Sequence, residues 1–573
     1  MEDKRTAIAV LLCMFVLMFW MEIVMAPYSR KAATAPAQTV QPQASTQTVL
    51  QNGQAAPGQS ASGQPLVANS TAKVEVPTPA QIKEAGIVSI ETPLYRMQVA
   101  KLGARLSSFQ LKNYKALLNS HNLLDLVFVN EGVLPLGVVA GPVNDAHVTY
   151  SLEKIEGMAA QDNGNYILPK NSTFILHFTG NLTDKIKITK SYTLNADSYL
   201  LKLNVNLSSP TPDGSPIWLE WTHFNPNHDN TQRLNHEYFA ILGADNKVKL
   251  TEPKDILTPV TEGGAAQWIS YGDRYFMSSL ISSTPNALAR IGKEGAVFSS
   301  RISGTAQNTE FNVFLGPKSH TYLKESGFQL ERNVDLGMFA FIAHPLLAAL
   351  NFFYQLLGNY GLAIILLTLT IKCLFLPLTK TSFKSMNAMQ KLQPEIKALR
   401  ERIQDPTQLN QEMMGLYKKH GVNPMGGCFP MLIQLPVFLG LYNALNNAIE
   451  LRHAPFALWI NDLSSIERLE VFGIGIPVMV LLMGASMFLQ QWTTPSSADP
   501  QQKKIMMMMP VIFTASFVIF PFPSGLVLYW LVNNLISIIQ QVYLRGDKKH
   551  TALQGTLIGS IGIFFVGFVL TLI

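Results

Sequence analysis

The chain has 573 residues, of which 14% are charged and 48% are hydrophobic. An average soluble domain carries roughly 25% charged residues, and the apolar residues here are gathered in long blocks, which argues against a wholly soluble enzyme and predicts an integral membrane protein. The formal net charge is only +6, so the positions of the charges along the chain are more informative than their sum. The three cysteines, Cys13, Cys373 and Cys428, lie inside apolar stretches, so we expect no disulfide framework in residues 29–350.

Residues 1–28 are predicted to form an N-terminal transmembrane signal anchor. The apolar block Thr6–Pro27 follows two basic residues and has about the 20 residues that cross a bilayer as a helix. A cleaved signal peptide has an apolar region of about 7 to 15 residues, so the longer block favours a retained anchor, with cleavage near Ala33–Ala37 as the alternative. Residues 29–80 are predicted to be a flexible linker, because they are rich in Gln, Ala, Pro, Ser and Thr.

Residues 81–333 are predicted to form an antiparallel β-sandwich. The residues Leu201, Leu203 and Val205 alternate with polar residues, which is typical of a strand with one buried face. Other strand-like runs, such as Ile217–Phe224, recur along this region with turn residues between them. A domain built from many such strands buries one face of each strand in a common core.

The C-terminal part of the chain is predicted to be helical and membrane-embedded. Residues 334–350 are expected to form an interfacial helix, interrupted at Pro345. Residues 351–546 are expected to hold a five-helix transmembrane core, which makes the fold class an α+β membrane protein. Residues 547–573 contain a basic patch and then the uncharged segment Thr551–Ile573, which is long enough for one more span. The five core spans are expected at Asn351–Leu378, Cys428–Ile449, Val471–Trp492, Ile505–Phe520 and Ser524–Leu544.

The charges of the loops orient this predicted bundle. Basic residues outnumber acidic ones between Thr379 and Met425, whereas acidic residues outnumber basic ones between Glu450 and Glu470. The positive-inside rule therefore places the first loop in the cytoplasm and the second loop, with the β-domain, on the outer side. Residues 380–422 are expected to form a cytoplasmic helical hairpin, broken near Asp405. The basic excess of this hairpin is either a topology signal or a docking surface for anionic headgroups or RNA.

Lys372 is the most informative single residue of the predicted bundle. It lies in an apolar run eight residues before the next charge, Lys380, which at about 1.5 Å per helical residue puts it roughly 12 Å inside the boundary. A cation at that depth is costly, which favours a functional cation in a hydrated site over a lysine that snorkels to the interface. Other polar residues at membrane depth support a hydrated cavity, although hydrogen bonds between helices explain them equally well. These residues are Thr368, Gln434, Asn533, Asn534 and Ser537.

No motif for catalysis or metal binding is found in the sequence. The spacing of His223, His228 and His236 matches no known ligand pattern, so these are interpreted as loop histidines. The chain contains no phosphate-binding glycine loop, no nucleophile elbow and no HExxH motif. We therefore predict no cofactor, no metal and no enzymatic activity.

Three segments of the chain resemble a known family. They are NPMGGCFPMLIQLP at 423–436, APFALWI at 454–460 and PSGLVLYW at 523–530. These segments closely resemble the YidC family of bacterial inner-membrane insertases, and the resemblance is continuous over residues 340–546. The anchor, the linker and the large outer domain fit the Gram-negative form of that family.

The resemblance implies a multi-pass protein of the bacterial inner membrane with a large periplasmic domain, similar to the sandwiches of sugar mutarotases and therefore supersandwich-like. It also implies that five core helices enclose a hydrophilic groove open to the cytoplasm and the lipid. The family usually has an arginine where this chain has Lys372, which keeps the charge but loses the bidentate guanidinium geometry. The positions that the resemblance assigns to the substrate groove are Lys372, Thr368, Gln434, Phe438, Tyr529 and Trp530.

By this resemblance the expected function is that of a membrane protein insertase and chaperone, acting alone or with the Sec translocon. The implied partners are nascent membrane proteins, membrane lipids, the Sec translocon, the ribosome and the receptor for the signal-recognition particle. Two alternatives stay open. A secondary transporter or channel would use Lys372 as an ion or substrate site, although no inverted repeat is evident. An envelope assembly factor would act through the periplasmic domain and use the bundle only as an anchor.

Overall fold

The structure is a computed structural model that describes residues 77–545. The predicted anchor, most of the predicted linker, His228, His236 and the segment 547–573 lie outside the described residues. Within 77–545 the description omits residues 119, 128–133, 158–159, 163–164, 212, 225–236, 257–259, 295–296, 424–428, 495–499 and 521.

A β-domain of two sheets follows the short helix α3 (Pro79–Ala85). The strands pair antiparallel, as predicted, except that β1 and β9 run parallel, which the sequence pattern does not reveal. The smaller sheet has six strands in the order β4 (Leu123–Asp125), β3 (Arg105–Lys115), β2 (Tyr95–Ala100), β1 (Ile87–Glu91), β9 (Asn165–Ile167) and β8 (Ala160–Asp162).

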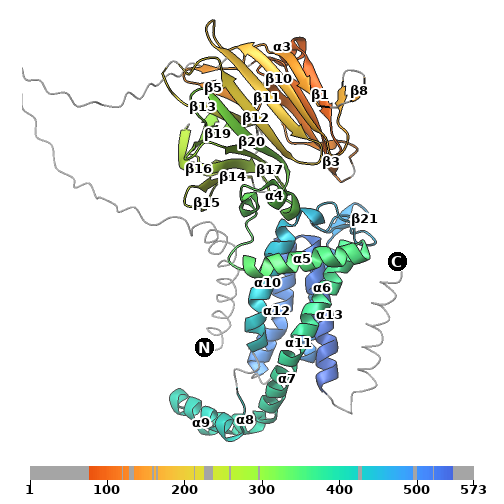
Figure 1. Cartoon of the computed structure of the whole chain (residues 1–573). Coiled ribbons are helices and arrows are strands. Elements are labelled where there is room, and N and C mark those ends of the chain that lie inside the picture. The colour runs from red at the N-terminus through yellow and green to blue at the C-terminus, as the bar shows by residue number, and fades with distance from the viewer. Residues whose placement is uncertain are drawn as a thin grey trace, which may run out of the picture.

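The larger sheet has 14 strands, and the two sheets enclose one hydrophobic core (Figure 1). The residues predicted to face that core from β12 (Leu200–Leu207) do so, since Leu201, Leu203 and Val205 are all fully buried. Strand β14 (Tyr238–Gly243) pairs with β15 (Val248–Thr251) and β16 (Val260–Gly272). The other strands follow the order β6 (Val143–Asn144), β5 (Gly137–Ala140), β13 (Ile217–Phe224), β19 (Val297–Ser303), β18 (Leu288–Glu294), β16 (Val260–Gly272), β17 (Phe276–Ser282), β20 (Asn308–Pro317), β12 (Leu200–Leu207), β11 (Lys187–Asn195), β10 (Thr173–Asn181) and β7 (Ser151–Glu156).

The chain leaves the β-domain through α4 (His320–Ser326) and enters α5 (Ala340–Leu357), which lies across the end of the helical bundle (Figure 1). Helix α5 begins and ends later than the predicted interfacial helix 334–350, and it contains Pro345 without ending there. It ends at Gly358, whose φ of 67° is in the left-handed region that favours glycine. The side chain of Asn359 then accepts from the first backbone N–H groups of α6 at 2.8 and 3.1 Å. The first core helix therefore starts at Tyr360 and not at Asn351, because this cap and not the end of an apolar run sets the boundary.

A helix lies in each of the five segments predicted to span the membrane, but not each of these helices is long and apolar enough to cross it. By length and apolarity, the described residues contain two helices able to cross a membrane, Ala340–Leu357 and Ser524–Leu544, or three if α6 and α7 count as one span bent by 59°. The segments Val478–Thr493 and Lys504–Ile519 are shorter apolar helices. The bundle consists of α6 (Tyr360–Leu374), α7 (Leu376–Lys391), α10 (Phe429–Asn447), α11 (Val478–Thr493), α12 (Pro500–Ile519) and α13 (Ser524–Arg545).

The third predicted span starts later than expected. A helix was predicted from Val471, but β21 (Leu469–Val471) and β22 (Ile474–Ile476) form a two-stranded hairpin before α11 begins. A short apolar run does not distinguish a strand from a helix, and Gly473 and Gly475 favour the strand pair.

The predicted helical hairpin at 380–422 covers most of α7, which belongs to the bundle, and two further helices, α8 (Gln393–Arg402) and α9 (Pro406–Lys419). Helices α8 and α9 form a hairpin at the end of the bundle far from the β-domain (Figure 1). The break falls at Asp405, as predicted, and its carboxylate caps α9 by accepting from two backbone N–H groups at 3.1 and 3.3 Å. The Ser385 hydroxyl donates to the carbonyl of Asn423 at 2.8 Å, so the two ends of the segment 385–423 lie next to each other.

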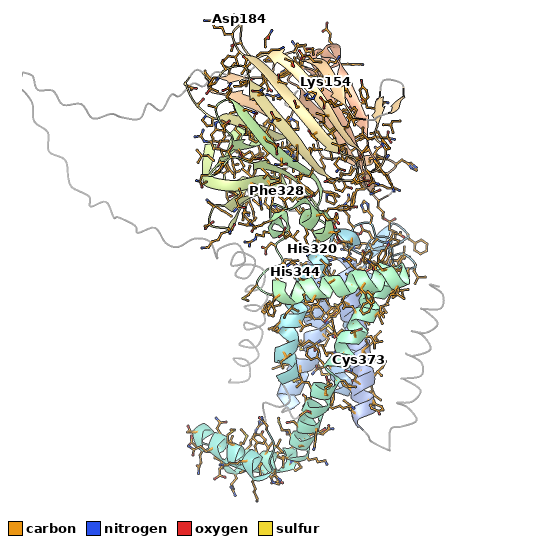
Figure 2. All side chains as sticks on the ribbon, viewed as in Figure 1. Lys154, Asp184, His320, Phe328, His344 and Cys373 are labelled. Carbon is orange, nitrogen blue, oxygen red and sulfur yellow. The ribbon has the colours of Figure 1, made fainter. Side chains whose placement is uncertain are left out.

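The loop between α10 and α11 docks on the β-domain. The side chain of Ile449, in the short helix η5 (Ile449–Leu451), belongs to the hydrophobic core of the β-domain. The guanidinium of Arg452 donates to the carbonyl of Ala116 at 3.1 Å, and Arg274 donates to the carbonyl of Asn446. In addition, the imidazole rings of His320 on α4 and His344 on α5 lie 5.4 Å apart (Figure 2). The β-domain is thus packed on the bundle and not merely tethered to it.

Candidate functional site

One face of α13 carries polar side chains at intervals of four residues. They are Tyr529, Asn533, Ser537 and Gln541, and residues four apart lie next to each other along a helix. Each of them contacts a polar group on another helix, so this row of polar residues connects α13 to α6, α10 and α11.

Lys372 is hydrogen-bonded to the middle of this row. Its ammonium group donates to the Ser537 hydroxyl at 2.7 Å, and that hydroxyl donates to the backbone carbonyl of Asn533 at 2.7 Å. The side chain is partly buried, and no carboxylate among the described residues lies within ion-pair distance of it. The ammonium group of Lys372 therefore points toward α13, and no carboxylate in the described part of the chain neutralises its charge.

Gln434 on α10 contacts the row one turn closer to the β-domain. Its amide donates to Asn533 Oδ1 at 3.1 Å, and it is also hydrogen-bonded to the hydroxyl of Tyr529. The structure thus brings Gln434 and Tyr529 together, whereas Lys372 contacts the same face of α13 two turns away, at Ser537. Thr368 is placed differently, because its side chain is 1% exposed and its hydroxyl donates to the carbonyl of Ile364 in its own helix at 2.7 Å.

Three of the predicted residues belong to an aromatic cluster. Phe438 on α10 lies edge-on to Trp530 at 4.8 Å between ring centroids, and Trp530 contacts Phe513 and Phe517 of α12 at 5.2 and 5.5 Å. Phe438 is also stacked with Tyr529 at 6.4 Å. This cluster offers a large apolar surface directly beside the polar row of α13.

A second group of polar contacts, between α11 and α13, was not predicted from the sequence. Thr493 donates to Gln541 at 2.7 Å, and Asn534 donates to Ser486 at 3.1 Å. The interval of four from Tyr529 to Gln541 is visible in the sequence and indicates a polar row on one face of a helix. The partners on α11 have no such signal, because single Ser and Thr residues are common in membrane helices.

The histidines of the β-domain show no metal site within the described residues, where no group of three potential ligands is found. The interpretation of His223 as a loop histidine was wrong, because it is buried in strand β13. It lies 3.9 Å from the Glu237 carboxylate and its ring packs on Tyr271 at 4.1 Å between centroids. Burial lowers the pKa of His223 to about 3, which keeps the imidazole neutral.

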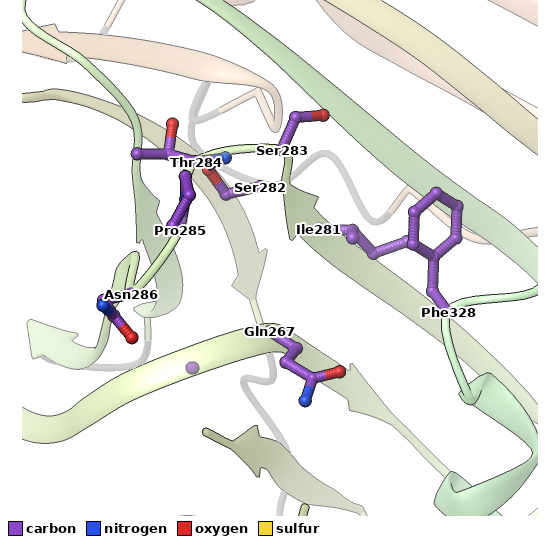
Figure 3. Close-up of a pocket in the computed structure, with 9 residues that line it drawn as sticks. Gln267, Ile281, Ser282, Ser283, Thr284, Pro285, Asn286 and Phe328 are labelled. Carbon is purple, nitrogen blue, oxygen red and sulfur yellow. Dashed lines mark hydrogen bonds between the residues drawn. The ribbon is translucent and has the colours of Figure 1, made fainter.

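The β-domain contains a small surface cavity of about 260 Å³ between β16, β17 and the segment after α4 (Figure 3). None of its lining residues is charged, so the cavity offers no carboxylate or imidazole for acid or base chemistry. The lining residues are Ala266, Gln267, Ile281, Ser282, Ser283, Thr284, Pro285, Asn286 and Phe328.

Comparison with known proteins assigns the two halves of the chain. Residues 87–349 match the family described as YidC periplasmic domain, and residues 352–551 match the family described as 60Kd inner membrane protein. A Pelobacter propionicus protein named membrane protein insertase YidC is 35% identical over 570 residues, covering 95% of this chain and 99% of that protein. A Syntrophobacter fumaroxidans protein of the same name is 37% identical over 489 residues, covering 80% of this chain and 86% of that protein.

Among solved structures, one described as an active YidC insertase with the first transmembrane domain resolved covers 80% of this chain and 94% of that chain. Its sequence identity is 18% and its TM-score is 0.35. The assignment consequently rests on the sequence relatives, which match both the β-domain and the helical bundle over nearly their full lengths. The chain therefore belongs to the YidC family of inner-membrane proteins with a periplasmic domain.

Proposed function

We propose that this protein inserts nascent membrane proteins into the bacterial inner membrane. Its relatives are named membrane protein insertases, and its polar row of α13 lies beside an aromatic cluster. In this proposal the polar row forms one wall of a groove that hydrates the translocated segment of a substrate. The apolar helix of the substrate meanwhile moves along Phe438 and Trp530 into the lipid.

The role of the groove is to lower the cost of moving polar groups through hydrocarbon. A backbone or side-chain polar group without a partner in lipid costs several kcal/mol, and polar walls replace part of its lost hydration. The driving force would come from partitioning of the apolar substrate helix and from the membrane potential, which contributes about 2.3 kcal/mol per charge per 100 mV.

The observation that carries the proposal is the position of Lys372. Its ammonium group is held by Ser537 on the facing helix, without a carboxylate partner among the described residues. A cation in such surroundings attracts carboxylates more strongly than a cation in water does. We propose that Lys372 attracts acidic residues of the translocated segment.

The test compares Lys372→Arg, Lys372→Ala and Lys372→Glu with the parent chain on one substrate carrying zero, one or two acidic residues in its translocated segment. We expect arginine to keep insertion, alanine to slow insertion of the acidic substrates by a factor of roughly 5 to 30, or about 1 to 2 kcal/mol, and glutamate to be worst. A lysine that only snorkels predicts that alanine is tolerated for every substrate. Equal insertion of all substrates by the alanine variant, at matched abundance, would remove Lys372 from the mechanism.

Two matched variants separate the charge from its surroundings. Lys380→Ala removes an exposed lysine of α7 and should leave the dependence on substrate charge unchanged. Ser537→Ala keeps the cation but removes its hydrogen-bond partner, so we expect a smaller defect with the same dependence on acidic residues.

The proposal includes a multi-pass topology, with the β-domain in the periplasm and the α8–α9 hairpin in the cytoplasm, where it contacts the ribosome or the Sec translocon. The charge balance of the loops supports this orientation. We also propose that Thr551–Ile573 crosses the membrane once more, because it is uncharged and follows a basic patch. A C-terminal reporter that is active only in the cytoplasm should then be silent, and an active reporter would contradict the additional span.

A further inference from the structure

The β21–β22 hairpin stands at the end of the bundle nearest the β-domain, the end where α5 also lies (Figure 1). Its base is fixed to the start of α11, since the buried Glu467 carboxylate accepts from the backbone N–H groups of Val478 and Met479 at 3.2 and 3.1 Å. The same carboxylate accepts from the indole N–H of Trp459. The hairpin is therefore held in a defined place, directly before the chain enters the bundle.

The tip of the hairpin combines complete exposure with an unfavourable backbone conformation. Phe472 is fully exposed, at 101% of its reference area, and Phe472 and Gly473 have φ angles of 52° and 79°. A two-residue turn with two positive φ angles favours Asn-Gly, and a bulky residue in the first position is strained. Neither the packing nor the turn geometry of the described residues explains a phenylalanine at this position, and such an outlier points to a function.

The rest of the hairpin presents an apolar face. The cross-strand pairs Leu469–Ile476 and Val471–Ile474 put four aliphatic side chains on one side of the ribbon, and Ile474 is 67% exposed. Among the described residues, none of the four belongs to the hydrophobic core of the bundle. An isolated two-stranded hairpin is marginally stable in water, so an apolar environment on this face would stabilise it.

The residues around the hairpin indicate that the apolar environment of its aliphatic face is lipid. The first turns of α11 expose Leu481 and Leu482 on the outside of the bundle, where a membrane helix meets lipid. The exposed Arg468 lies at the base of the hairpin and donates to the carbonyl of Gly475 at 3.4 Å, so its charge is placed to meet lipid phosphates. The hairpin thus stands directly before a helix that exposes apolar side chains from its first turns.

We propose that the β21–β22 hairpin is a lipid anchor that inserts Phe472 and its aliphatic face into the headgroup region of the outer leaflet beside α11. Together with α5 it would give the bundle a second point of contact with the membrane surface. Such an anchor would fix the tilt of α11 relative to the bilayer. This inference depends only on the bundle being embedded in a membrane, not on the proposed insertase activity.

The test uses the full chain, with its native cysteines replaced by serine, in vesicles of phosphatidylethanolamine and phosphatidylglycerol. Phe472→Cys is labelled with the fluorophore NBD, and quenching by doxyl lipids is compared with quenching by aqueous iodide. Leu481→Cys serves as the lipid-facing reference and Asp184→Cys, at the far end of the β-domain, as the water-exposed one (Figure 2). We expect the probe at 472 to be quenched by doxyl lipid and protected from iodide several-fold relative to the probe at 184.

A second variant tests whether the NBD label at position 472, and not the native phenylalanine, causes the insertion into lipid. Phe472→Asn suits a turn with positive φ better than phenylalanine does, so the hairpin should stay folded while its apolar tip is lost. With a probe at Ile474→Cys, this change should increase iodide quenching in vesicles. A probe at 472 that behaves like the one at 184 would overturn the proposal. So would a probe that is protected only in native membranes and not in pure lipid vesicles, since it would indicate a protein partner instead.

Discussion

The β-domain contains a buried charged cluster around Asp145. The Asp145 carboxylate is fully buried and contacts Arg105 at 2.7 Å and Lys190 at 2.5 Å, and both cations are buried as well. It also accepts from the backbone N–H of Val138 at 3.0 Å. Burial by itself would raise the pKa of Asp145, but the two cations and this hydrogen bond hold the pKa below its usual value.

We predict that Asp145→Asn destabilises the β-domain by about 3 to 5 kcal/mol, because it leaves the buried Lys190 without a counter-charge and Arg105 with Glu220 alone. The matched control is Glu310→Gln, whose partner Lys202 lies 3.9 Å away in an exposed pair, and it should cost less than about 1 kcal/mol. Thermal unfolding of the full chain in detergent, followed by tryptophan fluorescence, measures both. Similar losses in the two variants would contradict a special role for the buried cluster.

The same carboxylate gives a prediction on pH. Because the folded pKa of Asp145 is depressed, its contribution to stability is present above the unfolded value of 3.8 and is lost as the pH falls below it. The parent chain should therefore lose β-domain stability more steeply than Asp145→Asn as the pH falls below 3.8. Parallel acid-unfolding curves of the two chains would show that the cluster does not contribute to acid sensitivity.

At the scale of elements, the sequence predicts type and order better than boundaries. The alternation around Leu203 identifies β12 and its buried face, because successive side chains of a strand point to opposite faces of the sheet. The start of α6 was misplaced because Gly358 and Asn359 define it through one dihedral angle and one cap. Similarly, Lys372 was singled out by its depth, but its partner Ser537 depends on how two helices pack, which no single sequence pattern encodes.

The contact between the α10–α11 loop and the β-domain should depend on pH. Burial raises the pKa of Glu450, which accepts from the Ser319 hydroxyl at 3.3 Å and lies near His320. With a raised folded pKa, its stabilising contribution is complete below the unfolded value of 4.5 and is lost as the pH rises through the folded pKa.

We therefore predict that Glu450→Gln, which is neutral at every pH, protects this contact at pH 8 but changes little at pH 4.5. Hydrogen exchange of η5 and β17 in the full chain measures the effect, with His320→Gln as the control for the neighbouring histidine. Equal protection of parent and Glu450→Gln at pH 8 would show that the carboxylate is not what loosens the contact.

At the scale of the whole molecule, the two soluble parts are joined to the bundle in different ways. The β-domain shares its hydrophobic core with Ile449 and contacts Asn446 and Arg452. The α8–α9 hairpin, in contrast, leaves and re-enters the bundle at one point, marked by the hydrogen bond from Ser385 to Asn423. The first part is thus packed on the bundle, whereas the second can be removed with little disturbance of it.

The last prediction is that the α8–α9 hairpin, and not the β-domain, is essential for insertion. Replacing residues 387–421 with a short Gly-Ser linker closes a gap whose ends already touch, so the bundle should accumulate normally while insertion is lost. Deleting residues 85–320 would expose Ile449, so the variant also carries Ile449→Ser, which replaces this apolar side chain with a polar one. We expect this variant to have lower thermal stability but to keep insertion. The opposite pattern, with insertion lost only on deletion of the β-domain, would favour an envelope assembly factor that acts through that domain. Insertion by the linker variant at the parent rate would reduce the basic hairpin to a signal for topology.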